Sequence, residues 1–386
     1  MSSSTEVATP RKTALNRIHR EMGAKMVDFN GWDMPVEYPP FGARKSGGLV
    51  AEHLAVRNSV GIFDVSHMGD IRLHGPQALA AVQKMTMNDA SHLEIGQAQY
   101  SALLYPAGTF VDDVIVHRLG ERDYLLVINA GTREKDIAWV RQEAKGFDCA
   151  VEHLSDDFTQ IAIQGPNGWR VLQKLTDADL TKVKFYWLTR GTVCGLPNTL
   201  IARTGYTAED GFEIYVPTDQ ATSERVWMAV VAAGEEFGLL PCGLGARNTL
   251  RLEGALSLYG HEISGTITVL EAGLSRFLKL DKGDFTGRDA LLKQQAEGIK
   301  RTLVGLENVD RGIPRDGYTV TDLGGASIGN VTSGSPGPFL KKNVALAYVP
   351  PKFAALGTEV AVEIRGTMVK CKVVPIPFYK RPKRST

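Results

Sequence analysis

Residues 99–129 read QYSALLYPAGTFVDDVIVHRLGERDYLLVIN. Three apolar runs, at 99–105, 109–118 and 124–129, are separated by turn-forming residues such as Pro106-Ala107-Gly108. Runs of this kind, bounded by turn residues, predict consecutive antiparallel strands. The flanking sequence mixes strand and helix patterns without a regular βαβ alternation. We therefore predict an α+β fold built on antiparallel sheets.

The middle strand carries two adjacent carboxylates, Asp112 and Asp113. Side chains alternate along a strand, so Asp112 shares a face with Val114 and Val116, and Asp113 shares the other face with Val111 and Ile115. Burial of an unpaired carboxylate is costly, so the buried one needs a partner or a function. Pairing with a backbone amide is the simpler role, and acid–base chemistry is the alternative.

The chain divides into two regions of different character. Helices are expected at 13–21, 49–58, 76–85, 132–144, 222–237 and 245–257, and residues 31–41 are expected to form a compact loop. After one more helix at 284–295 the pattern becomes all strand, and it ends in a hairpin turned by Arg365-Gly366. We predict two interwoven α+β lobes over 13–281 and a small C-terminal β-barrel over 282–380.

Composition excludes several classes of function. The net charge is +1, which argues against nucleic-acid or membrane-surface partners. No run approaches the ~20 apolar residues of a membrane span, and residues 1–10 lack the apolar core of a secretory signal, so a cytoplasmic protein is expected. The one dense basic run reads as a solvated tail: Lys380, Arg381, Lys383 and Arg384.

The sequence also lacks the motifs of common cofactors. The four cysteines lie far apart, which disfavours a zinc site or a disulfide framework. No P-loop occurs, and Asn248 stands where a dinucleotide fingerprint starting at Gly243 would need its third glycine. Neither a metal nor a nucleotide cofactor is predicted.

Several other polar residues can have either a structural role or a role in ligand binding. Asn129 ends a strand, Tyr206 lies in a loop with two glycines, and Glu213 lies on a strand. Arg247 and Arg251 are four residues apart on one helix. Turn formation, a solvated face and surface salt bridges are the simpler roles, and ligand contact is the other.

At these segments the chain resembles the T-protein family of the glycine cleavage system. The matching stretches run in the same order from near residue 13 to about residue 378, and we rely on the collinear set rather than on one motif. They are Met26 to Phe29 with Gly31-Trp32, Phe63 to Met68, Asp112-Asp113, Asn129-Ala130-Gly131, Gln164-Gly165-Pro166, Thr204 to Thr207, Gly243 to Glu253, Tyr259-Gly260 and Val331 to Gly334.

The resemblance implies a three-lobed, clover-leaf arrangement around a folate channel. It implies transfer of an aminomethyl group from the lipoyl arm of lipoylated H-protein to tetrahydrofolate, a co-substrate, with release of ammonia. By this similarity Asp113 is the catalytic carboxylate, Glu213 contacts the pterin and Arg247 contacts the folate. The remaining positions that the family uses to line the folate site fall on Met68, Tyr100, Val127, Asn129 and Tyr206.

The chain departs from the family pattern at a few positions. Asn248 stands where an Asp is common, residues 264–269 lack an acidic pair and Thr-Pro, and Arg276 replaces a Trp. These changes leave two alternatives: a tetrahydrofolate-dependent demethylase on the same scaffold, and a folate-binding accessory protein without transferase activity. Asp113 is present and no cysteine lies in the accessory proteins' motif, so an enzyme is favoured.

Overall fold

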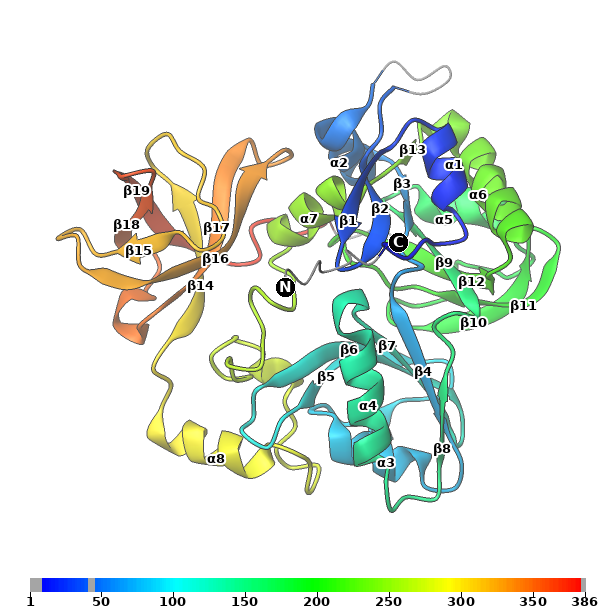
Figure 1. The fold of residues 1–386 in the computed structure, drawn as a ribbon, viewed down its shortest axis with the longest axis horizontal. Helices are drawn as coiled ribbons and strands as arrows, with labels where there is room; N and C mark the ends of the chain where they lie inside the picture. Colours follow the sequence, from blue (N-terminus) through cyan, green and yellow to red (C-terminus); the bar gives the residue numbers. More distant parts are fainter. Residues whose placement is uncertain (1–8, 41–45, 383–386) are drawn as a thin grey trace, which may run out of the picture.

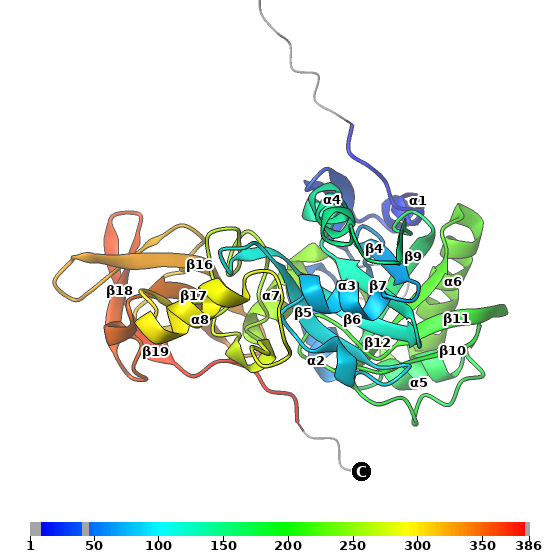
Figure 2. The same cartoon turned by 90° about the horizontal axis from the view of Figure 1, so that it is seen from below.

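The computed structural model describes residues 9–40 and 46–382, which form three lobes (Figure 1). Two lobes are built on open sheets and pack together, and the third is a β-barrel that extends to one side (Figure 2). In the described ranges no helix is long and apolar enough to cross a membrane. Lys383 and Arg384 of the basic run, and residues 1–8, lie outside the described residues.

The first lobe contains the strands predicted at 99–129. Its five-stranded antiparallel sheet has the order β5 (Ala98–Leu104), β6 (Phe110–Gly120), β7 (Asp123–Ile128), β4 (Gly69–His74), β8 (Ala150–His153). Helices α3 (Ala78–Met85) and α4 (Arg133–Glu143) pack on one face. Val114 and Val116 point into that core, so the opposite face of β6 carries Asp113.

The second lobe is a six-stranded sheet. Its order is β10 (Leu188–Val193), β11 (Leu196–Ala202), β12 (Gly211–Pro217), β9 (Phe158–Gln164), β3 (Gly61–Asp64), β13 (Leu240–Pro241). Only the short pair β13–β3 is parallel among these described strands. Helices α5 (Gly168–Gln173) and α6 (Gln220–Gly234) cover one face around the buried Trp227, and α1 (Asn16–Glu21) contributes to the same core.

The third lobe is a closed six-stranded barrel. The strands follow one another in the order β14 (Thr302–Asn308), β17 (Lys342–Val349), β16 (Ser327–Gly337), β15 (Thr319–Thr321), β18 (Glu359–Ile364), β19 (Thr367–Val374). Alternate Val and Ala side chains fill its interior. Helix α8 (Arg288–Glu297) precedes it. The α+β fold with a C-terminal barrel that the sequence predicts is confirmed.

The prediction of a compact loop at 31–41 was wrong for most of the described part of that segment. Residues Lys25–Phe29 (β1) and Trp32–Glu37 (β2) form an antiparallel hairpin. Its turn residues Asn30 and Gly31 have φ angles of 51° and 80°. Asn-Gly is the preferred pair for a two-residue hairpin turn, and this signal outweighs the nearby Pro and Gly residues. Residue 41 lies outside the described residues.

Helix α7 (Leu244–Glu253) lies where the lobes meet. Arg251 pairs with the buried Glu262 at 2.7 Å and donates to Ser333 of the barrel at 2.8 Å. Glu253 accepts from His53 and Arg57 of helix α2 (Gly48–Asn58) at 3.1 Å each. These buried pairs hold α7 in place, and α7 carries Arg247 to the site described next.

Candidate active site

A cavity lies between the two open sheets, and we call it the inner cavity. It encloses about 1110 Å³, including space open to solvent. All eight residues that the sequence nominated line it: Met68, Tyr100, Asp113, Val127, Asn129, Tyr206, Glu213 and Arg247.

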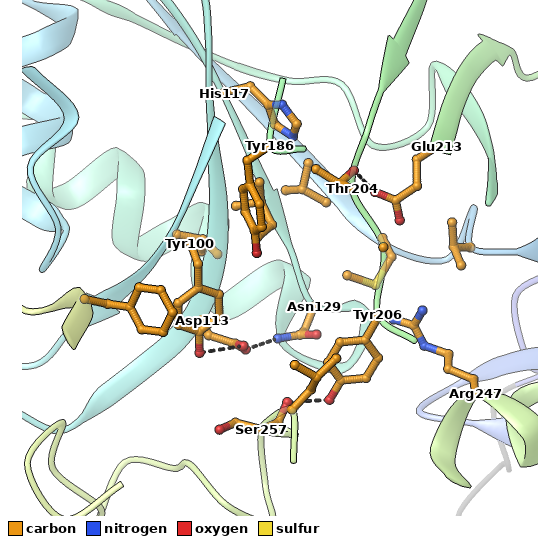
Figure 3. Close-up of a pocket in the computed structure, with 18 of the residues that line it drawn as sticks. Tyr100, Asp113, His117, Asn129, Tyr186, Thr204, Tyr206, Glu213, Arg247 and Ser257 are labelled. Carbon is orange, nitrogen blue, oxygen red and sulfur yellow. Dashed lines mark hydrogen bonds between the residues drawn. The ribbon is translucent and has the colours of Figure 1, made fainter. Parts of the chain in front are cut away.

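The two adjacent carboxylates of β6 have different surroundings. Asp112 is fully buried and accepts hydrogen bonds from the backbone amide of Asn129 at 3.0 Å and from the Thr132 hydroxyl at 3.0 Å. It therefore has the simpler role, because it fixes the turn after β7. Asp113 faces the inner cavity instead (Figure 3).

Two neutral donors hold the Asp113 carboxylate. The Asn129 amide donates to it at 2.7 Å and also to Asp112 at 2.8 Å, so both hydrogens of that amide are used. The Tyr100 hydroxyl donates to the other Asp113 oxygen at 3.1 Å. Tyr100 in turn packs against Phe277, with ring centroids 4.8 Å apart. The carboxylate is thus fixed in direction by neutral groups, and no salt bridge to it occurs among residues 9–40 and 46–382.

The surroundings of Asp113 change its acidity. Burial, helped by the negative charge of Asp112, raises the pKa of Asp113 to about 7, although the hydrogen bonds from Asn129 and Tyr100 oppose the rise. A carboxyl group with a pKa near neutrality can both take up and release a proton at physiological pH. This is the property that general acid–base catalysis requires.

The opposite wall carries a second carboxylate and a guanidinium. Glu213 on β12 accepts from the Thr204 hydroxyl, and burial raises the pKa of Glu213. Arg247 lies over the Tyr206 ring, 4.6 Å from its centroid. Salt bridges were the simpler role expected for both Arg247 and Arg251. Arg251 forms one with Glu262, whereas no ion pair of Arg247 with a carboxylate occurs in the described residues.

The loop that carries Tyr206 is shaped by packing against Gln164. A Cβ atom at Gly205 would lie 2.0 Å from the Gln164 Oε1 atom. Gln164 donates to the Thr204 carbonyl at 3.0 Å and accepts from the Thr207 hydroxyl at 2.8 Å. The Tyr206 hydroxyl donates to the Ser257 carbonyl. The glycine is therefore needed at this point for a close approach within the protein.

A second cavity joins the first, and we call it the outer cavity. It encloses about 980 Å³, including open solvent. The two cavities share six lining residues: Tyr100, Tyr186, Gly205, Leu256, Arg276 and Phe277. Arg381 also lines the outer cavity, and Arg276 is exposed at the boundary. The arrangement gives a ligand a route from solvent to Asp113.

Several lining residues were missed by the sequence reasoning, including His117, Tyr186 and Gln160. His117 shares the face of Asp113 and Ile115, so strand alternation could have found it. Tyr186 follows no strand or helix pattern and could not have been found in that way. Arg276 was noted only as a departure from the family pattern, and it lies at the boundary between the cavities.

Comparison with known proteins agrees with this architecture. The model of the GCVT N-terminal domain matches residues 15–282, and that of the glycine cleavage T-protein C-terminal barrel domain matches residues 301–380. The chain belongs to the glycine cleavage T-protein family. It is therefore an aminomethyltransferase, an enzyme of the glycine cleavage system.

The similarity to known aminomethyltransferases extends over nearly the whole length of this chain and of each relative. The aminomethyltransferase of Koribacter versatilis is 69% identical over 98% of this chain and 98% of its own, and that of Acidobacterium capsulatum is 63% identical over 100% of both. The crystal structure of the glycine cleavage system aminomethyltransferase T from Bartonella henselae has a TM-score of 0.88 and 34% identity, over 96% of this chain and 98% of its own.

The described residues hold no group of three or more His, Cys, Asp or Glu side chains arranged to bind a metal ion. The polar groups of the inner cavity are instead separate carboxylates, hydroxyls, two amides, an imidazole and two guanidiniums. Such a set suits an organic ligand with several donors and acceptors.

Proposed function

We propose that the inner cavity binds tetrahydrofolate and that the enzyme transfers to it the one-carbon unit carried by the aminomethylated lipoyl arm of H-protein, with release of ammonia. The observation that carries the proposal is Asp113, a half-buried carboxyl group with its pKa raised to about 7, lining a cavity whose other wall holds Glu213 and Arg247.

The side chains suit the parts of a reduced folate. A pterin presents an amino group and a ring N–H on one edge, which match a carboxylate acceptor such as Glu213. The carboxylates of the folate tail match Arg247. Asp113 then takes the place beside the folate nitrogen N10, while Met68, Val127 and Tyr206 form walls for the rings.

The transfer needs proton movement and no change of oxidation state. In the donor, one methylene carbon is bonded to sulfur and to an amino nitrogen. Both of these bonds break, and the carbon forms new bonds to N5 and N10 of tetrahydrofolate. The protons of N5 and N10 leave with ammonia and with the lipoyl thiol. One carboxylate that accepts and returns a proton can catalyse this exchange, and such a group typically accelerates a reaction ~10²–10⁴-fold.

The proposal also keeps three expectations from the sequence. Residues 13–281 are the folate-binding unit and 282–380 the barrel unit. H-protein is the macromolecular partner, and the outer cavity offers its arm a route to Asp113. The enzyme works in the cytoplasm.

The test is a comparison of donors with the purified full chain. Aminomethyl-loaded H-protein, or methylated amines and thioethers, are supplied with tetrahydrofolate, and ammonia and the folate products are quantified. We expect methylenetetrahydrofolate and ammonia in equal amounts when aminomethyl-loaded H-protein is the donor, and no product with the other donors. Formation of 5-methyltetrahydrofolate from a methyl donor, with no product from H-protein, would instead establish the demethylase reaction. Folate binding with no product from either donor would contradict the proposed reaction.

A further inference from the structure

His117 is a buried polar residue that the proposed chemistry does not use. Its side chain lines the inner cavity and the residue is 1% exposed. In the described residues neither ring nitrogen forms a hydrogen bond, and Nδ1 is a buried atom without a partner. Leaving a buried polar group unpaired costs roughly 1–3 kcal/mol, so this imidazole needs an explanation.

Strand geometry places His117 at the closed end of the cavity. Asp113, Ile115 and His117 follow one another on the cavity face of β6. The next side chain on that face, Leu119, packs against an apolar cluster that includes Leu125, the cross-strand neighbour of His117. A ligand that extends from Asp113 along this face therefore reaches His117 last.

Tyr186 lies beside His117 and forms a wall between the inner and outer cavities. Its φ angle is 62°, in the left-handed region that a bulky residue rarely adopts. Two backbone hydrogen bonds hold it there, from its amide to Arg203 at 3.0 Å and from Ala98 to its carbonyl at 2.8 Å. In Figure 3 the hydroxyl end of the ring points toward the part of the cavity that holds Asp113, and His117 lies at the other end of the ring. Strain held in this way at a cavity wall is typical of a binding site.

His117 is neutral at physiological pH. Burial lowers its pKa to about 4. A neutral imidazole offers one N–H donor and one nitrogen acceptor. The carboxylate of Glu213, on the facing sheet, offers only acceptors when it is ionised. Together they match a heteroaromatic ring that carries N–H donors together with a carbonyl or ring-nitrogen acceptor.

We propose that the His117 imidazole forms a direct hydrogen bond to the polar edge of the reduced pterin ring, and that this bond makes the closed end of the cavity selective for pterins. The inference rests on the proposed binding of tetrahydrofolate, and it adds a specificity-determining residue to that site. The Tyr186 ring forms the wall beside the bound heterocycle.

The test uses two variants of similar size, His117→Leu, which removes the hydrogen-bonding groups, and His117→Asn, which keeps a donor and an acceptor. Binding of tetrahydrofolate and of p-aminobenzoylglutamate, which lacks the pterin, is measured by calorimetry. We expect His117→Leu to weaken tetrahydrofolate binding about tenfold to a hundredfold. Binding of the fragment should change less than about twofold, and His117→Asn should recover part of the loss.

Thermal unfolding of the ligand-free variants separates binding from folding. Because the imidazole has no hydrogen-bond partner in the described part of the chain, His117→Leu should not lower the melting temperature. Equal weakening of both ligands together with a lowered melting temperature would assign His117 a structural role and overturn the inference. Unchanged tetrahydrofolate affinity in His117→Leu would overturn it as well. If the wild-type enzyme itself fails to bind tetrahydrofolate, the proposed function fails rather than this detail of it.

Discussion

Asp112 and Asp113 are neighbours on one strand, and the pleat of the sheet gives them different environments. Asp112 lies on the core side and is used by the turn after β7, through Asn129 and Thr132. Asp113 lies on the cavity side, held by Asn129 and Tyr100. One amide joins the two carboxylates, so the structural residue also sets the direction of the proposed catalytic one.

The pH dependence of the reaction should report Asp113. If its carboxylate accepts the folate proton, kcat/KM rises with pH and levels off above an inflection near 7, the pKa to which burial raises this group. The profile is measured in steady state from pH 5.5 to 9. Asp113→Asn should remove that inflection from the residual activity. An unchanged inflection in the variant would assign it to another group.

Removal of the charge at Asp112 should act on stability. Asp112→Asn weakens the hydrogen bonds that this buried side chain accepts from the turn after β7, so we expect a loss of about 1–3 kcal/mol in the free energy of unfolding. The measurement is urea denaturation, with Asp289→Asn as control because that side chain is 94% exposed. Equal stability of the two variants would contradict the role given to Asp112.

At the scale of elements, the site depends on a loop packed against the sheet that supports it. The loop before β12 carries Thr204, Gly205 and Tyr206 into the inner cavity, and Gln164 of β9 holds it by hydrogen bonds. The side chain of Gln164 occupies the space that a Cβ atom at Gly205 would need.

Gly205→Ala should therefore displace the loop. The added methyl group would overlap Gln164, and overpacking of this kind costs about 1–3 kcal/mol. We expect both a lower melting temperature and weaker tetrahydrofolate binding. Gly265→Ala is the matched control, since its nearest contact would be an ordinary 3.5 Å. Wild-type binding and stability in Gly205→Ala would show that the loop adjusts freely.

The sequence predicted individual strands and helices better than it predicted the contacts between them. Alternation along 112–116 assigned the two carboxylates to opposite faces, and hydrophobic patterns located the barrel. Val111, expected on the face of Asp113, packs instead with Val114 and Val116, because the pairing of β5 and β6 shifts register beside it. The Asn30-Gly31 hairpin was missed because neighbouring Pro and Gly residues suggested a loop. The backbone conformation of Tyr186 could not be predicted, since it depends on contacts with Arg203 and Ala98. All eight nominated site residues share a cavity. Strand, loop and helix patterns singled out Asp113, Asn129, Tyr206, Glu213 and Arg247 as candidates, and the resemblance assigned their roles and completed the set.

At the scale of the whole molecule, buried charges join the barrel to the second lobe. Glu253 of α7 accepts from His53 and Arg57, and also from the backbone amide of Phe339 in the barrel lobe at 3.1 Å. Burial opposes ionisation of Glu253, but the hydrogen bonds and charges of His53 and Arg57 keep its pKa below the usual value. This residue therefore links the barrel to the lobe that holds Arg247.

Glu253→Gln should loosen the barrel from the second lobe. Loss of one partner from a buried ion pair lowers the free energy of unfolding by about 3–5 kcal/mol, because the buried positive charge of Arg57 is then only partly compensated. We expect a melting temperature several degrees lower and faster hydrogen exchange in α2 and in the loop at Phe339. Glu297→Gln is the control, as its side chain is 64% exposed. Identical exchange in Glu253→Gln and wild type would contradict the linking role.

The central claim is that Asp113 handles the proton when the one-carbon unit passes to tetrahydrofolate bound in the inner cavity. The most direct measurement is a single turnover, in which enzyme with bound tetrahydrofolate is mixed with aminomethyl-loaded H-protein and methylenetetrahydrofolate is followed in time. We predict that Asp113→Asn slows this turnover by about 10²–10⁴-fold while tetrahydrofolate binds with near wild-type affinity. Transfer in Asp113→Asn at the wild-type rate, with folate bound, would contradict the claim.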